Sequence, residues 1–140
     1  MLRKFGFISA CLLLPLWVAF AQSGGASHSG GAEGAGAELS AEQTATYFKT
    51  VDELLATAKE EYSAGNSDAA NEALIEAYLE NFEYIEAPLE KVDHELVKEL
   101  EESLRVALSE MVNAGVKPEE FSTAVDAALA ELDQAETLLK

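Results

Sequence analysis

Residues 69–92 constrain the fold more than any other part of the sequence, because their apolar side chains recur every three or four positions. This spacing puts the apolar side chains on one face of an α-helix and predicts that the face is buried. The predicted buried residues are Ala70, Leu74, Ala77, Tyr78, Leu79, Phe82 and Ile85. Pro88 lacks a backbone N–H, so we expect this helix to kink or stop there, close to Ala87.

A preceding helix is predicted over residues 41–64, with the same apolar period. Ser40 and Gln43 have the spacing of a capping box at its start. Gly65 suits the left-handed backbone that commonly follows a helix, and Ser67 is expected to cap the next one. A connection this short predicts that the two helices form an antiparallel hairpin.

Two more amphipathic helices follow. Asp93 is expected to cap the first of them, over residues 94–114, and Gly115 to end it. Pro118 is well placed in the first turn of the other. No alternating strand pattern is present, so residues 40–140 are predicted to form an all-α, antiparallel up-down four-helix bundle.

The N-terminal region has the composition of an export signal followed by a tether. Arg3 and Lys4 precede an apolar run, and Ala21 ends a pattern that suits signal peptidase. We therefore expect a signal peptide over residues 1–21 and a flexible Gly/Ser-rich linker over 22–39, which would place the protein in the periplasm or outside the cell. An uncleaved signal would instead serve as a membrane anchor. Cleavage would remove the only cysteine and so exclude disulfides from the mature chain.

The chain is strongly acidic. It has 26 acidic and 9 basic residues and a formal net charge of -17. A nucleic-acid or anionic-lipid partner needs a basic surface, so the charge argues against both. It is compatible with metal cations, with cationic partners, or simply with solubility. The sequence contains neither a nucleophile–histidine–acid set nor a Gly-rich phosphate loop, and we predict no enzymatic activity.

A pair of glutamates, Glu83 and Glu86, is the best candidate for metal chemistry. Side chains at i and i+3 project from the same helix face and can share one ion. Ligation by oxygen alone would suit iron, manganese, calcium or magnesium. No Glu-x-x-His motif is present, which disfavours a ferritin-type di-iron centre. The alternative interpretation of these acids is an ordinary solvated helix face.

Two residues of the third predicted helix could support such a site. Arg105 has the spacing to pair with Glu101 on the same helix, or it could reach across to Glu83 and Glu86. His94 is the only histidine in the predicted bundle; a solvated residue at the start of the helix is its plainer interpretation.

Three runs of sequence together resemble a known family. They are YSAGNSDAAN at residues 62–71, AYLENFEYIE at 77–86 and LEESLR at 100–105. The pattern is similar to the extracytoplasmic helical domain that precedes the membrane part of bacterial Ftr-type high-affinity iron permeases. By motif match, the resemblance implies that the positions of interest for function include Glu83, Glu86, Glu101 and Arg105. It implies that Tyr78 and Phe82 are framework residues around them.

What the resemblance implies is a periplasmic domain that binds iron, as Fe²⁺ or Fe³⁺, and hands it to a membrane iron permease or another iron-uptake component. We expect Glu83, Glu86 and Glu101 to bind the metal, with Arg105, Tyr78 and His94 in support. The permease family carries its transport motifs, Arg-Glu-x-x-Glu, in transmembrane helices, and this sequence lacks them. The alternative function is an acidic structural or interaction module that docks a basic protein and binds no metal.

Overall fold

The computed structural model describes residues 39–140. The expected signal peptide, 1–21, and the expected linker, except for its last residue, lie outside the described residues. Within residues 39–140 every regular element is helical and no strand is present. None of the helices in this region is long and apolar enough to cross a membrane.

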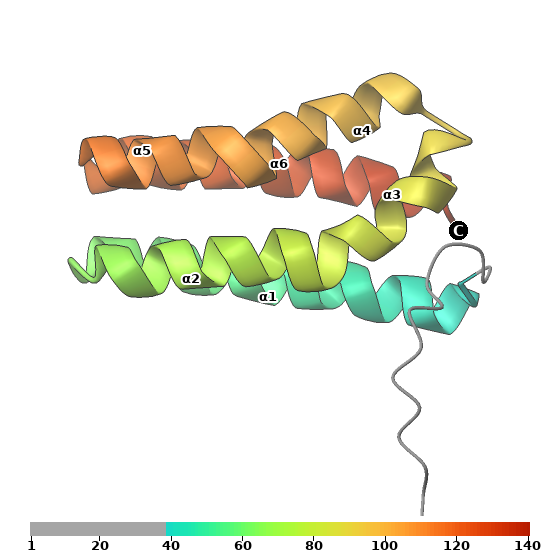
Figure 1. The fold of residues 1–140 in the computed structure, drawn as a ribbon, viewed down its shortest axis with the longest axis horizontal. Coiled ribbons are helices and arrows are strands. Elements are labelled where there is room, and N and C mark those ends of the chain that lie inside the picture. Colours follow the sequence, from blue (N-terminus) through green and yellow to red (C-terminus); the bar gives the residue numbers. More distant parts are fainter. Residues whose placement is uncertain (1–38) are drawn as a thin grey trace, which may run out of the picture. The chain divides into compact units, whose positions relative to one another are not determined.

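The described elements form four helical rods, which lie side by side in Figure 1. The first rod is α1 (Ala41–Ser63), and the fourth is α6 (Pro118–Leu138). The second rod consists of α2 (Ser67–Ala77), η1 (Tyr78–Phe82) and α3 (Glu83–Glu90). The third rod consists of α4 (His94–Glu101), η2 (Glu102–Ala107) and α5 (Leu108–Ala114). Each rod contacts the next along the chain, and α1 also contacts α6.

Most of the predicted helix ends are confirmed. The Ser40 hydroxyl accepts a hydrogen bond from the Gln43 N–H at 3.2 Å, and the Gln43 side chain accepts one from the Ser40 N–H at 3.0 Å. Asp93 accepts a bond from the backbone N–H of Leu96 at 3.1 Å. Gly115 has the left-handed φ of 67° that allows the third rod to end there.

Two end predictions are wrong in detail. Ser67 is the first residue of α2, and the capping position belongs to Asn66, whose side chain makes no capping hydrogen bond. Pro88 does not stop the second rod, because α3 continues to Glu90. Pro88 falls in the last turn and removes only the bond to the carbonyl of Tyr84, an exposed residue that water can reach.

The second and third rods each contain a π-helical segment, η1 and η2. A π turn contains an additional residue, so the side chains beyond it rotate relative to a regular α-helix. The prediction that Leu79 is buried is wrong, because this side chain is 48% exposed. Asn81 is buried instead, and its Nδ2 donates to the carbonyl of Glu76 at 3.0 Å. That bond satisfies the amide inside an apolar environment.

A continuous apolar core joins the four rods. Its largest fully buried side chains include Phe82 of the second rod and Phe121 of α6. The ring of Tyr62 packs on Phe121 with centroids 4.6 Å apart, and its hydroxyl donates to the carbonyl of Val116 at 2.7 Å. Buried alanines such as Ala70 face the contact between α2 and α1.

Candidate functional site

Four of the residues singled out from the sequence come together where the second and third rods meet. They are Tyr78, Glu86, Glu101 and Arg105, which we call the Tyr78 cluster. They come from four successive elements: η1, α3, α4 and η2. About two turns away along the same rods, Asn71 donates a hydrogen bond to Asn113 at 3.2 Å, and α2 contacts both α5 and η2.

The π segments help to assemble this cluster. Tyr78 is the first residue of η1, and Arg105 lies within η2. A π turn changes the direction of the side chains that follow it, which in this cluster applies to Glu86, beyond η1. Single π turns occur frequently at functional sites.

Tyr78 provides a mostly buried hydroxyl at the centre of the cluster. Its side chain is 8% exposed, and its ring packs against Phe82 with centroids 6.2 Å apart. Burial, followed by the hydrogen bond and the negative charge of Glu86, raises the pKa of Tyr78 to about 12. The hydroxyl is therefore a neutral donor at physiological pH in the absence of a bound cation.

Glu86 is a half-buried carboxyl with unused bonding capacity. Burial raises its pKa, and the charges of Glu101 and Glu83 raise it further. The Tyr78 hydroxyl and the Arg105 guanidinium act in the opposite direction, because they favour the carboxylate. The Oε1 atom of Glu86 is buried and has no hydrogen-bond partner in the described part of the chain. A buried, unpaired oxygen is costly and is a candidate position for a ligand contact.

Arg105 is the cation of the cluster. Its Nη1 donates to the Oε1 of Glu101 at 2.8 Å, so the predicted pair along the helix is confirmed. This bond is the main reason why the pKa of Arg105 is raised, and the nearby Tyr78 contributes to the shift. Arg105 does not form an ion pair with Glu83 or Glu86, although its charge lowers the pKa of Glu86.

Glu83 contributes to the cluster only through its charge. Its side chain is exposed, and its carboxylate raises the pKa of Glu86 from the preceding turn. Among residues 39–140, no group of three or more His, Cys, Asp or Glu side chains is arranged to hold a metal ion. Metal binding by Glu83, Glu86 and Glu101 together stays a prediction.

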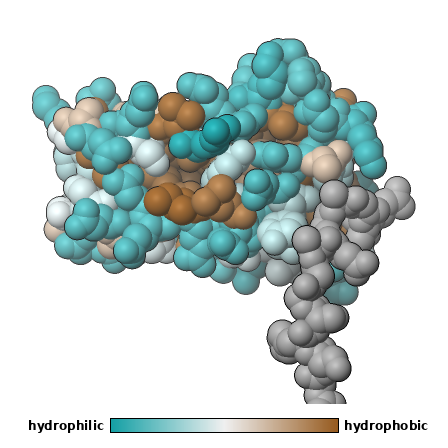
Figure 2. Space-filling model, in the orientation of Figure 1, coloured by the Kyte–Doolittle hydropathy of each residue, from teal (hydrophilic) through white to brown (hydrophobic). Residues whose placement is uncertain are grey.

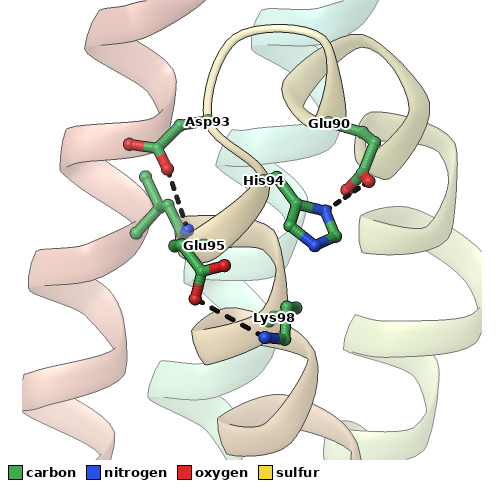
Figure 3. A network of polar contacts seen from close by, with 6 residues as sticks. Glu90, Asp93, His94, Glu95 and Lys98 are labelled. Atoms are coloured by element: carbon green, nitrogen blue, oxygen red, sulfur yellow. Dashed lines mark hydrogen bonds and ion pairs between the residues drawn. The ribbon is translucent and has the colours of Figure 1, made fainter.

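His94 belongs to a separate polar network at the start of α4, shown in Figure 3. The Nδ1 atom of His94 is hydrogen-bonded to the carboxylate of Glu90. Asp93 caps the helix beside it, and Lys98 pairs with Glu95 at 3.5 Å. Both His94 and Glu90 are exposed, which agrees with the plainer interpretation of His94 as a solvated residue at a helix start.

Two other half-buried acids were not singled out from the sequence. Burial raises the pKa of Glu131 in α6, with a further contribution from Glu99, and its Oε2 has no hydrogen-bond partner among the described residues. Burial also raises the pKa of Asp52 in α1, with contributions from Asp133 and then other nearby acids. Their places in the sequence could have indicated partial burial, because Asp52 follows Val51 and Glu131 precedes Leu132. Val51 and Leu132 are both buried core residues.

The shallow hollows on the described surface lie elsewhere. One is lined by residues 65–69 in the turn between α1 and α2, and the other by Glu42, Gln43, Thr46 and Tyr47 at the start of α1. Neither of these two hollows contains a member of the Tyr78 cluster.

Comparison of this chain with protein-family models, with curated proteins and with solved structures finds no match in any of the three.

Proposed function

We propose that this protein is an iron-handling helical domain that acts outside the cytoplasm and passes iron to a membrane permease. The observation that carries the proposal is the Tyr78 cluster. Two of the three sequence runs that carry the resemblance to the iron-permease domain contribute two residues each to this cluster. The part of this convergence that helix spacing alone does not produce is the approach of Tyr78 and Glu86, on the second rod, to the Glu101–Arg105 pair on the third.

The chemistry of the cluster suits capture of a hard cation. Glu86 and Glu101 repel each other, and Glu83 adds to the repulsion. A cation between the first two carboxylates would remove that repulsion and use the unpaired Oε1 of Glu86. Iron accepts such oxygen ligands, and the resemblance is the reason to name iron among the hard cations. Arg105 would hold Glu101 while no cation is bound and release it as the cation enters.

The proposal also specifies the fold, the location and the partners of the domain. The scaffold is an antiparallel up-down four-helix bundle, which the short connections between successive rods favour. The protein is exported to the periplasm or secreted, is not an enzyme, and meets the membrane through its permease partner or an uncleaved signal. Its net charge of -17 disfavours nucleic acid as a partner.

A second candidate function is an acidic interaction module that docks a basic protein. The observation that favours it is the absence of any lysine or arginine between Glu60 and Glu90, a stretch that covers the whole second rod. Such a surface attracts cationic partners whether or not a metal is bound.

Calorimetric titration of the purified protein tests the iron proposal. Fe²⁺ under anaerobic conditions and Fe³⁺ as a soluble chelate would be compared with Ca²⁺ and Mg²⁺. The Glu86→Gln/Glu101→Gln variant should lose saturable iron binding. A control variant, Glu42→Gln/Glu119→Gln, has the same net charge but changes exposed acids outside the cluster, and it should bind like the wild type.

Two results would contradict the proposal. One is weak, equal binding of every cation to all three proteins, which would identify the acids as a solvated surface. The other is iron binding that survives in the Glu86→Gln/Glu101→Gln variant, which would place the iron at a different site.

A further inference from the structure

One strip of the second rod combines exposed apolar side chains with carboxylates. We call it the acidic ridge; it consists of Glu72, Ile75, Glu76, Leu79, Glu80 and Glu83. Ile75 is 54% exposed and Leu79 is 48% exposed. They lie four residues apart and are therefore neighbours along the rod. Figure 2 shows apolar surface over the part of the second rod where α2 meets η1, with hydrophilic surface around it.

Packing of the core does not explain why Ile75 and Leu79 are aliphatic, because both side chains are exposed. Leu74, Ala77 and Tyr78 fill the buried face of the same turns. A single exposed leucine is ordinary, whereas adjacent exposed aliphatic residues bordered by polar ones are typical of a surface that contacts a partner. The apolar centre and polar edge of the ridge have the composition of a small docking site.

The carboxylates of the ridge are uncompensated. None of its four glutamates forms an ion pair with another residue of the described chain. The sequence contains no lysine or arginine between Glu60 and Glu90, so no cation of the second rod itself can neutralise them. The ridge therefore presents a concentrated negative charge around an apolar centre.

The charge selects among the occupants that an apolar strip can have. A second copy of the chain, docked by the same strip, would place glutamates opposite glutamates and is disfavoured. An anionic lipid surface is disfavoured for the same reason. A basic amphipathic helix fits: apolar residues at i and i+4 would cover Ile75 and Leu79, and flanking lysines or arginines would reach the glutamates.

We propose that the acidic ridge is the docking surface for a basic amphipathic helix of another protein. This inference rests on the second candidate function above and specifies its surface and the chemistry of its partner. It does not require metal binding at the Tyr78 cluster.

The test uses a labelled synthetic helix of leucine and lysine, with leucines at i and i+4, and measures its binding by fluorescence anisotropy. A peptide of the same composition with scrambled leucine positions is the peptide control. The Ile75→Ser/Leu79→Ser variant should bind the helix about tenfold more weakly than the wild type. Val92→Ser/Leu138→Ser is the matched control, because it changes equally accessible apolar residues outside the ridge, 53% and 41% exposed, and it should bind normally.

A second pair of variants separates the ridge from the overall charge. Glu72→Gln/Glu76→Gln/Glu80→Gln and Glu42→Gln/Glu110→Gln/Glu119→Gln remove the same number of exposed carboxylates, but only the first removes them from the ridge. The first should weaken binding several-fold more than the second. Circular dichroism of each variant would establish that it is folded.

Three outcomes would overturn the proposal. The ridge and control variants could lose affinity equally, or the scrambled peptide could bind as well as the amphipathic one. The wild type could also sediment as a dimer that Ile75→Ser/Leu79→Ser converts to a monomer, which would make the ridge an interface between two copies. Iron titration of that variant should match the wild type, so a failure of peptide docking is distinguishable from a failure of iron binding.

Discussion

Replacing Leu79 by alanine tests the most consequential difference between the sequence pattern and the structure. The apolar stripe read from the sequence includes both Leu79 and Phe82, whereas the structure leaves Leu79 48% exposed, on the same side of the rod as the exposed Ile75, and Phe82 fully buried. Fully burying a leucine contributes about 1.5–3 kcal/mol, so the covered half of Leu79 contributes about 1 kcal/mol. The better helix propensity of alanine offsets a few tenths of a kcal/mol of this. We therefore expect Leu79→Ala to lower the free energy of unfolding by about 0.5–1 kcal/mol.

The companion variant Phe82→Ala should cost about 3–5 kcal/mol, because it leaves a cavity under a ring that is 0% exposed. That is a large part of the roughly 5–15 kcal/mol that stabilises a typical domain. Urea unfolding followed by far-ultraviolet circular dichroism would measure both variants against the wild type, with equal m values as the condition for comparing them. The expected losses of unfolding free energy differ by more than the error of extrapolating to zero urea, so the measurement can distinguish the two variants.

The reasoning would be refuted if Leu79→Ala cost about 2–5 kcal/mol, the range found for a buried leucine. Such a result would mean that Leu79 is packed in the core, as the apolar pattern of the sequence predicted. It would also remove the acidic ridge, because one of the two apolar residues at its centre would no longer be exposed.

Three further predictions concern electrostatics and backbone strain. Burial raises the pKa values of Asp52, Glu86 and Glu131, so the folded state holds these protons more tightly than the unfolded state. The ionised carboxylates therefore destabilise the fold at pH values above their raised pKa values, and stability should rise as the pH falls through those values toward the ordinary 3.8 of Asp and 4.5 of Glu. A melting temperature that falls steadily from pH 7 to pH 5 would contradict this. The Glu86→Gln variant should lower the pKa of Tyr78 from about 12 toward its ordinary 10.0, which an ultraviolet titration of the phenol would detect, and an unchanged titration would show that Glu86 does not act on it. Gly115→Ala should cost about 1–2 kcal/mol through its left-handed φ of 67° although the site has space for a methyl group, and a neutral effect in thermal unfolding would show that the turn adjusts freely.

Much of the fold follows from local chemistry that the sequence displays directly. The capping box at Ser40, the cap at Asp93 and the glycine at 115 act within a few residues of themselves, so their effects could be predicted without knowledge of the neighbours. The apolar period gave the four helices and most of their buried residues for the same reason. The predictions failed at Ser67 and Pro88, where the difference is less than one helical turn.

The candidate site depends both on contacts within one helix, which sequence spacing predicts, and on contacts between rods, which the tertiary fold creates. The pair of Arg105 with Glu101 is a contact between successive turns, and its spacing predicted it. The approach of Glu86 and Tyr78 to that pair joins different rods; the sequence offered a reach from Arg105 to Glu86 only as an alternative, and the inclusion of Tyr78 came from the family resemblance. His94 and Glu83 were also expected to belong to the site, yet the fold places His94 in another network and leaves Glu83 in solvent.

The sequence by itself determined which segments are helical, where most of them end and how acidic their surface is, because these properties depend on neighbouring residues and on composition. The tertiary structure alone decided that the second and third rods contain π turns, that Asn81 rather than Leu79 is buried, and that Tyr78, Glu86, Glu101 and Arg105 meet. Which face of the second rod meets its neighbours decides that Asn81 and not Leu79 is buried. The π turns depend on the tertiary structure because one additional residue in a helical turn barely changes local propensity but rotates the side chains beyond it. Whether that rotation is favourable depends on the packing of the neighbouring rod.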